Sequence, residues 1–441
     1  MTPALADTSN GIETRVLDLH KKFLETGKPH PNLLPFNESS INRFETLGFP
    51  HSKHEMYTFV NTKKLAATGF SLQREGQIEK EFIQRHIYPG CESSYLVLVD
   101  GVFRPELSNP IALGTGLKIS SLADAVSDPS IKKYLSESID KENDAFAAIN
   151  GAFLKHGVFL EVPPKKHLEC SLQILHVSTG SDSEPVTTHP RLFVKLGKLS
   201  ELRMIIKFAG KRGNYFVNCV QDFLVGEGGG ITYAQVQSDP SNSWNFCKSR
   251  FHLDRNSWTI ADNACHGARL VRNHFEVHLK DVNAELRLNG VSVLKNEEQV
   301  HNFVRVHHES PHCTSNQKFK NVINDKGRAS FDGTVIVNPG AQLTYSDQLI
   351  NNLMLSDEAR ADNKPTLMIF ADDVKCTHGA TVGQIDETQL FYLTTRGLSQ
   401  DRARELLTKS FAESIIQEMK FPMVVEDLNN TLLKKLEQGH G

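Results

Sequence analysis

The chain is 441 residues long, with 39% hydrophobic and 23% charged residues and a formal net charge of -3. This balance is typical of a soluble globular protein and excludes an intrinsically disordered or membrane-spanning chain. The near-neutral charge also argues against nucleic acid or an anionic membrane as the main partner, and the length suffices for two or three structural units.

The start of the chain and its cysteines both indicate the cytoplasm. The first residues, MTPALADTSNGIETRVLDLH, are polar and acidic, whereas a secretory signal needs a basic start and an apolar stretch. No run of about 18 apolar residues occurs that could span a membrane. The seven cysteines contain no CxxC pair, which excludes a disulfide framework and a zinc knuckle. They are Cys91, Cys170, Cys219, Cys247, Cys265, Cys313 and Cys376.

Residues 1–156 are expected to form an N-terminal domain that is mixed but mostly helical. Turn signals stand at Gly48-Phe49-Pro50 and at Tyr88-Pro89-Gly90. The stretch 132–153 is interpreted as one helix that leads into the next region.

Residues 157–385 change to short strands separated by clusters of Gly, Pro, Asn, Asp and Ser, and helical periodicity disappears. The clearest strand alternates apolar and polar side chains, as expected for a half-buried strand. Its apolar side carries Val271, Phe275, Val277 and Leu279, and its polar side carries Arg272, His274, Glu276, His278 and Lys280. So many strands without helices indicate a mainly β core, and periodicity leaves a sandwich, a barrel and a solenoid open.

Residues 386–441 return to helical periodicity and are expected to form a C-terminal helical domain. A short helix ends at Gly397, Ser399 caps the next one, and a last amphipathic segment covers residues 424–436. The apolar stripe of the second helix includes Leu406, Phe411 and Ile415. A small domain can bury this stripe only in part, so we expect a partner there, and we expect the β core to fold without these helices.

Cys376 and His378 are the strongest candidate ligands. Residues two apart in a strand project to the same face, so a thiol and an imidazole would lie side by side. Both groups bind iron and zinc, but a cluster is ordinarily held by about four protein ligands. Any metal must therefore be shared with another chain or held transiently. The alternative is that both residues are packing residues, because their face is otherwise apolar.

Other motifs point to weaker interpretations. His307, His308, His312 and Cys313 are rich in ligand atoms, but the turn at Pro311 favours surface or turn histidines. The glycine run 226–230 leads into a strand and is interpreted as a turn, not a phosphate loop. The motif GxxxxGK(S/T) is absent, so ATP hydrolysis would have to come from a partner.

The segment ADDVKCTHGATVGQ, residues 371–384, resembles the signature of the SufD branch of the SufB/SufD family, the scaffold subunits of the SUF iron-sulfur cluster assembly machinery. Matching residues continue at Asp386-Glu387, Arg396-Gly397 and, upstream, at Lys364-Pro365 and His308. The resemblance implies a right-handed parallel β-helix flanked by helical domains. It also implies a non-catalytic role, with pairing to SufB through the β-helix and to the ATPase SufC through the C-terminal helices. The resemblance also allows the isolated chain to form a homodimer.

From the resemblance we expect no cofactor held stably by the isolated chain, only transient iron or a nascent cluster at a subunit interface, with Cys376 and His378 among its ligands. The residues expected to dock the ATPase are Phe391, Leu406, Phe411 and Ile415. Two other functions stay open: a purely structural SufB paralogue without a metal role, and a carbohydrate-active β-helix enzyme. The enzyme would need a cluster of Asp with Arg or Lys on one solenoid face.

Overall fold

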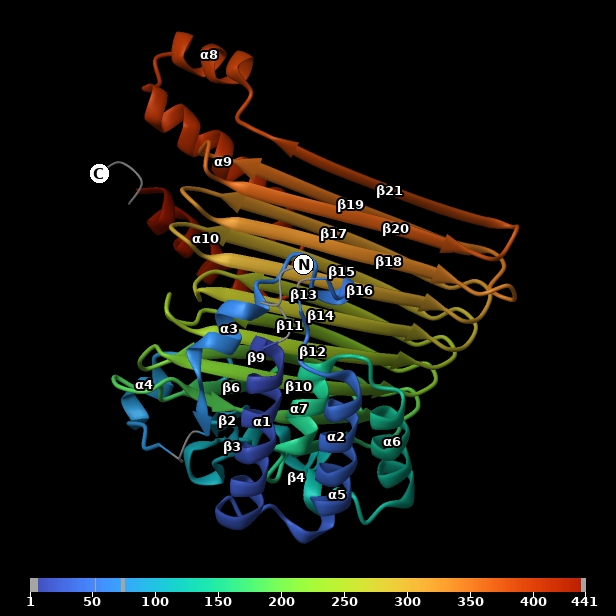
Figure 1. Ribbon diagram of the computed structural model, residues 1–441. Helices are drawn as coiled ribbons and strands as arrows, with labels where there is room; N and C mark the ends of the chain where they lie inside the picture. The colour runs from blue at the N-terminus through green and yellow to red at the C-terminus, as the bar shows by residue number, and fades with distance from the viewer. Residues whose placement is uncertain (1–6, 52, 73–75, 438–441) are drawn as a thin grey trace, which may run out of the picture.

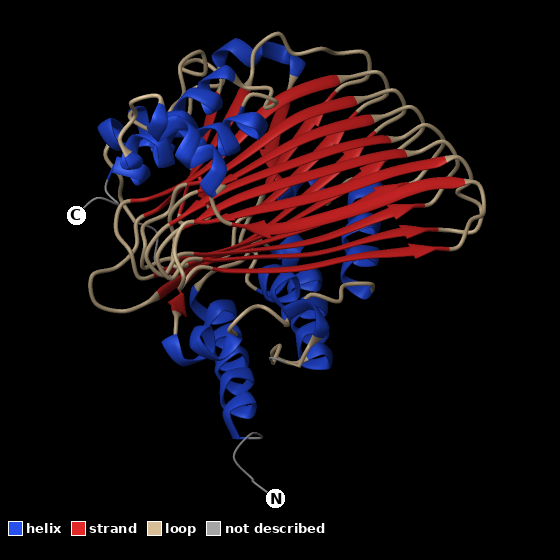
Figure 2. Ribbon diagram, turned by 90° about the horizontal axis from the view of Figure 1, so that it is seen from above, coloured by secondary structure: helices blue, strands red, loops and turns tan. Residues whose placement is uncertain are grey.

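The computed structural model describes residues 7–51, 53–72 and 76–437, and its centre is a β-solenoid built from two parallel sheets (Figures 1 and 2). The solenoid has about seven turns between residues 172 and 383. Helices from the two ends of the chain pack on the outer faces of the sheets. The expected mainly β solenoid with helical regions at both ends is confirmed. None of the described helices is long and apolar enough to cross a bilayer.

Each turn of the solenoid gives one strand to each sheet, so strands next to each other in a sheet are next-but-one in the chain. The first sheet, sheet A, contains in order β4 (Lys118–Ser121), β5 (Val158–Val162), β8 (Arg191–Leu196), β10 (Tyr215–Val225), β12 (Trp244–Leu253), β14 (Leu270–Leu279), β16 (Gln299–His308), β18 (Arg328–Val337) and β20 (Arg360–Ile369). The short β1 (Ser71–Leu72) and β7 (Val186–Thr188) join its margin beside β10.

The second sheet, sheet B, lies opposite. It contains in order β3 (Val102–Phe103), β2 (Tyr95–Val99), β6 (Leu172–Ser178), β9 (Glu201–Gly210), β11 (Gly230–Gln237), β13 (Trp258–Cys265), β15 (Glu285–Leu294), β17 (Thr314–Ile323), β19 (Thr344–Met354) and β21 (Val374–Gly383).

Alternating side chains explain why these segments form solenoid strands. In β15, Leu286 and Leu288 point inward and are buried in the core between the sheets, whereas Glu285 and Arg287 point outward. The outward side chains near the end of the same strand, Val291 and Val293, are apolar because the C-terminal helices cover them. The period of two thus sets the face, and the helices decide which outward positions are buried.

A repeated turn with one residue at positive φ leads from sheet A to sheet B. In successive turns this residue donates its N–H to the carbonyl oxygen of the residue just before its equivalent in the next turn, as from Asn256 to Val282 at 3.0 Å. Asparagine suits the left-handed conformation because its short polar side chain tolerates it. The residues at this position are Leu199, Gly228, Asn256, Asn283, His312 and Leu343, with φ from 54° to 64°.

We expect Leu199→Asn to stabilise the protein by about 0.5 to 1 kcal/mol, because leucine at φ 56° is strained and its side chain is already 43% exposed. Urea unfolding of both chains measures the difference. The control is Leu24→Asn at an equally exposed leucine inside a helix, α1 (Asp7–Thr26), which should destabilise. A gain at Leu24, or none at Leu199, would contradict the assignment of strain.

The N-terminal helices cover the outer face of the first turns of sheet A. The packed elements are α1, α2 (Leu34–Leu47), α6 (Pro129–Asp140) and α7 (Ala145–Ala152), together with short segments between them. Their apolar side chains meet outward aromatic residues of the sheet, among them Phe216, Trp244 and Phe246. The remaining short elements are α3 (Thr62–Thr68), α4 (Lys80–Gln84) and α5 (Leu122–Ala125), with single turns η1 (Pro31–Leu33), η2 (Glu55–Tyr57), η3 (Pro105–Leu107) and η4 (Ile111–Gly116).

The single helix predicted over 132–153 is wrong, because the chain breaks into α6 and α7 at residues 141–144. Asp144 is the N-cap of α7, and its carboxylate accepts the N–H of Phe146 at 3.0 Å. Glu142 also turns away from the helical direction and is buried against sheet A. The carboxylates of this break therefore find partners on the sheet that a continuous helix would not reach.

The C-terminal helices pack on the outer face of sheet B. They are α8 (Glu387–Thr395), α9 (Gln400–Ile416) and α10 (Pro422–Glu437), and Ser399 caps α9 as predicted, with its Oγ accepting the N–H of Arg402 at 3.3 Å. Ile416 and Phe421 are fully buried against strand residues such as Val236 and Val291. The expectation that the core folds without these helices overlooked this contact, since α9 and α10 complete the outer layer of sheet B.

Candidate functional site at the open end of the solenoid

The two ends of the solenoid differ in whether further strands close their edges. At the N-terminal end, the antiparallel strands β4 and β3 close the sheets. At the other end, β20 and β21 are the outermost strands, and no described strand pairs with their outer sides (Figure 1). Unpaired backbone N–H and C=O groups along such edges are a template for another chain. The end formed by β20 and β21 is therefore the open end.

Cys376 and His378 lie in β21 and point into the solenoid, as their shared parity predicts. Cys376 is in register with Ser346 of β19, and His378 is in register with Gln348. Both partners are fully buried between the sheets, so these columns of side chains run inward from the open end. The thiol and the imidazole thus lie on the last turn of the interior, and among the described residues no further strand stacks on them.

The exposure of the two residues differs. His378 is exposed, whereas Cys376 is half-buried and packs near Val335, Val337 and Ala371. This partial burial raises the pKa of the Cys376 thiol above its ordinary value. The protein by itself therefore keeps the thiol protonated, and a bound cation would be needed to favour the thiolate.

These two side chains are too few to hold a metal alone. Among the described residues, no group of three or more His, Cys, Asp and Glu side chains is arranged to hold a metal ion. Because a cluster ordinarily needs about four protein ligands, Cys376 and His378 can supply only part of a coordination sphere. The donor chemistry, one soft thiolate and one imidazole, suits iron.

Exposed apolar side chains surround the open end. They come from the last three strands, β19, β20 and β21, and from the turns beside them. Single exposed apolar residues are ordinary, but a group of them marks an interaction site. The group consists of Leu343, Tyr345, Met368, Ile369, Phe370 and Val382, with exposed fractions from 39% to 57%. Sequence reasoning missed this rim, although the apolar run 368–370, which alternation cannot explain, was a signal for it.

The other candidate ligands do not come together. His307 points outward from sheet A, whereas His308 points inward, where its Nε2 lies 2.8 Å from Ser315 Oγ. His312 occupies a turn at φ 60°, and Cys313 is fully buried. Burial lowers the pKa of His308 to about 4. The prediction of surface or turn histidines therefore holds for His312 but is wrong for His308, which is fully buried inside the solenoid. Gly228, at φ 64°, lies in a turn as predicted.

The four residues expected to dock an ATPase fall into two groups. Phe391 is 69% exposed on α8 and Leu406 is 43% exposed on α9. Phe411 is partly buried against the core, and Ile415 is only 1% exposed because it packs on sheet B. Tyr392, which was not predicted, is 57% exposed beside Phe391. The accessible apolar surface of this region is therefore formed by Phe391, Tyr392 and Leu406.

Comparisons with known proteins agree on one family. Residues 176–411 match the model described as "SUF system FeS cluster assembly, SufBD core domain", and residues 19–174 match the model of the SufBD protein N-terminal region. An iron-sulfur cluster assembly SufBD family protein of Synechocystis is 26% identical over 92% of both chains. The iron-sulfur cluster assembly protein SufD of Escherichia coli is 27% identical over 88% of this chain and 89% of its own. The SufD protein of Bacillus subtilis is 22% identical over 69% and 70%.

Proposed function

Because the chain belongs to the SufBD family of iron-sulfur cluster assembly proteins, with SufD proteins among its relatives, we propose that it is a non-catalytic scaffold subunit of a cytoplasmic SUF complex. It pairs through its open end with a SufB-type paralogue and through α8 and the start of α9 with a SufC-type ATPase. Nascent clusters form at the paired ends.

The open end supports the first partner. A paralogous solenoid ends in strands of the same kind, so it can pair with the edges of β20 and β21 and continue both sheets. The apolar rim would then be buried between the two subunits, as in the core of a stable interface. This is the observation that carries the proposal, because an uncapped solenoid end is otherwise a liability for aggregation.

Iron at this interface is cargo and not a resident cofactor. Cys376 and His378 give two donors at the last turn of the interior, and the facing end of the paralogue supplies the others. A site shared in this way holds a cluster only while the two ends are together. Separation of the ends would then release the cluster to an acceptor.

The ATPase is the second partner because this chain lacks the residues for nucleotide hydrolysis. The sequence contains no P-loop motif. The exposed side chains of Phe391, Tyr392 and Leu406 form the surface for the ATPase, since aromatic residues that project from a helix are typical anchors of protein interfaces. The buried Ile415 has no part in it.

A carbohydrate-active enzyme is a poorer interpretation. The required cluster of Asp with Arg does occur on the outer face of sheet A, where Arg250 Nη1 lies 2.9 Å from Asp222 Oδ1. Both side chains are at most 6% exposed because the N-terminal helices cover them. No polysaccharide could reach these groups in the described structure.

Two single substitutions should test the two interactions independently. We expect Val382→Lys on the exposed edge strand to abolish pairing with the paralogue and to leave ATPase binding intact, because an edge charge opposes strand addition. Phe391→Asp should have the reverse effect, because it places a charge in an apolar contact. Co-expression of the three subunits and affinity capture of this chain measure both interactions.

The control is Ile111→Lys, which places a lysine on a residue that is 78% exposed in the N-terminal region, outside both surfaces. It should retain both partners. If Val382→Lys keeps the paralogue while the chain remains folded, the open end is not the pairing surface, and if Phe391→Asp keeps the ATPase, the docking surface lies elsewhere.

A further inference from the structure

The interior of the solenoid changes from apolar to polar beneath the open end. Two columns of inward side chains cross sheet B and end at the two candidate ligands. Leu286 is followed by Ser315, Ser346 and Cys376, and Leu288 is followed by Gln317, Gln348 and His378. All of these except the two ligands are at most 2% exposed. Buried leucines thus give way to hydroxyl and amide groups, although burial of a polar group is costly unless it is hydrogen-bonded.

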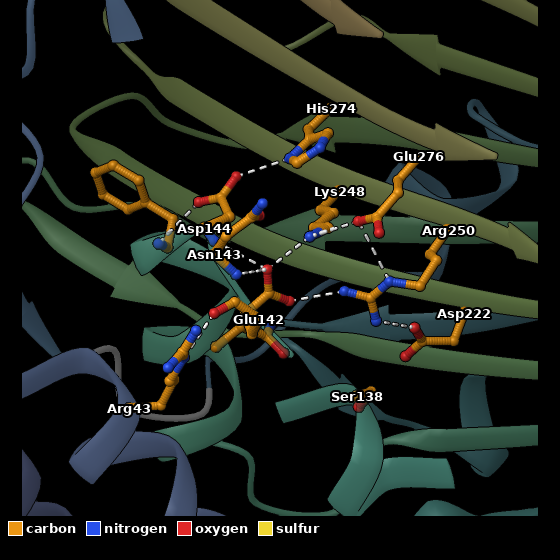
Figure 3. Close-up of polar contacts among 12 residues, drawn as sticks. Arg43, Ser138, Glu142, Asn143, Asp144, Asp222, Lys248, Arg250, His274 and Glu276 are labelled. Carbon is orange, nitrogen blue, oxygen red and sulfur yellow. Dashed lines mark hydrogen bonds and ion pairs between the residues drawn. The ribbon is translucent and has the colours of Figure 1, made fainter. Parts of the chain in front are cut away.

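Two sets of buried polar groups meet this requirement within the chain. In the serine column, Ser315 Oγ lies 2.9 Å from Ser346 Oγ and 2.8 Å from Nε2 of the buried His308. The charged groups beneath the N-terminal helices are also paired, as Figure 3 shows for Glu142, which lies 2.6 Å from Lys248 Nζ. Neither set needs a further partner.

The glutamine column, in contrast, lacks a donor at its outer end. Gln348 Nε2 donates to Gln317 Oε1 at 3.1 Å, which fixes the direction of the Gln348 carboxamide. Because the nitrogen and the oxygen diverge from the same carbon atom, an amide that donates toward β17 turns its oxygen toward β21. That oxygen is buried, and none of the described residues donates a hydrogen bond to it. A buried acceptor without a donor is destabilising.

His378 is placed to supply the missing donor. It is in register with Gln348 on the neighbouring strand, and neighbouring strands lie about 5 Å apart. Its ring is exposed and can turn about its side-chain bonds. Gln317 Nε2 also lacks a partner, but its inner neighbour in the column is Leu288, which has no polar side-chain atom. The unpaired oxygen of Gln348 is therefore the one that borders a candidate ligand.

We propose that Gln348 is a positioning residue for His378, whose ring donates an N–H to Gln348 Oε1 and so keeps the lone pair of its other nitrogen for iron. The inference rests on the proposed role of His378 as a ligand of the shared site. A neutral imidazole carries one N–H and one lone pair. A histidine that binds a metal usually donates its other N–H to a protein acceptor, which fixes the tautomer and the orientation of the ring.

The hydrogen bond would prepare the ring before the partner arrives. An exposed imidazole without such a bond samples several rotamers, and ordering it costs conformational entropy when the site forms. A ring held by a buried, rigid acceptor has already met this cost. A carboxamide is suited to the task because it accepts a hydrogen bond without adding a buried charge.

NMR of the isolated chain can observe the ring N–H of His378 without iron or a partner. A ring N–H that faces water exchanges too rapidly to give a signal, whereas a hydrogen-bonded one is retained. We expect the chain labelled with 15N-histidine to show this signal on one ring nitrogen, identified by its absence in His378→Ala. Gln348→Met, which removes the polar atoms, should abolish the signal. Gln348→Glu, which keeps an oxygen there, should retain it.

The control is Asn352→Leu in a neighbouring interior column. Asn352 is 3% exposed and its Nδ2 donates to the carbonyl oxygen of Thr381 in β21 at 3.0 Å, so its loss also destabilises the protein. This substitution should leave the His378 signal unchanged. Absence of the signal in the parent chain, its survival in folded Gln348→Met, or its loss in folded Gln348→Glu would each overturn the inference. The first of these results needs no variant of Gln348.

Cluster production by the assembled complex connects the ring to function. Gln348→Met should lower it about tenfold. Adding Gln348→Met to His378→Ala should cause no further loss, because the ring that Gln348 positions is gone. His378→Ala by itself should cost little stability, since water can then reach Gln348 Oε1.

The two proposals fail in different ways. If His378→Ala lowers cluster production and Gln348→Met does not, the positioning role of Gln348 is wrong and the ligand role of His378 stands. If both variants produce clusters normally, the ligand role is wrong, and the positioning role is overturned with it even where Gln348→Met abolishes the NMR signal.

Discussion

Replacing His378 by alanine is expected to reduce iron-sulfur cluster production by about tenfold or more, with the complex and its ATPase activity intact. The imidazole is exposed at the open end, so its loss should change the free energy of unfolding by no more than about 0.5 kcal/mol. The proposed shared site, in contrast, would lack one of its donors. Cluster-dependent enzyme activity, complex yield and thermal midpoint should be measured in the same cells.

Substitution of Cys376 should lower both stability and cluster production. Cys376→Ala removes a half-buried side chain and should cost about 1 kcal/mol of stability in addition to its effect on cluster production. We expect the His378 change to be at least as damaging to cluster production. The control is Lys375→Ala on the outward face of the same strand, where the ammonium group lies over the ring of Tyr345. Normal cluster activity in His378→Ala with an intact complex would show that this segment contributes only to packing. It would favour a purely structural paralogue.

Deleting the chain after Gln384 is expected to abolish folding of the β core. The deletion removes Ile415, Ile416, Phe421 and Leu428, each of which contributes about 1.5 to 3 kcal/mol through burial. The sum exceeds about 5 kcal/mol, which is comparable with the whole stability of a domain. It also exposes Val291 and its apolar neighbours on the outer face of sheet B. Solubility and the thermal midpoint of the truncated chain measure the effect.

A matched point substitution separates folding from docking. Phe391→Ala, at a residue that is 69% exposed, should change the thermal midpoint little and still weaken ATPase binding. A truncated chain that stays soluble with the midpoint of the full protein would contradict the packing of α9 and α10 described above. In that case the C-terminal helices would be an independent domain.

The amino-acid sequence by itself determined the local features. Alternation with a period of two fixed the strands and placed Cys376 and His378 on one face of β21, and the cap at Ser399 fixed the start of α9. These signals are contained in neighbouring residues and need no tertiary contact. The repeated turn was harder to find, because glycine, asparagine, histidine and leucine all occupy its position of positive φ.

Only the tertiary structure decided which outward faces are covered and which charges meet. Glu142 and Lys248 are separated by 106 positions, and Asp144 and His274 by 130, so no local pattern could pair them. For the same reason a continuous helix was predicted across the break at 141–144. The stripe with Ile415 has the same periodicity whether it meets a partner or the protein's own sheet. Burial of an amphipathic face is required by the hydrophobic effect, but the surface that buries it is set by the path of the chain in space.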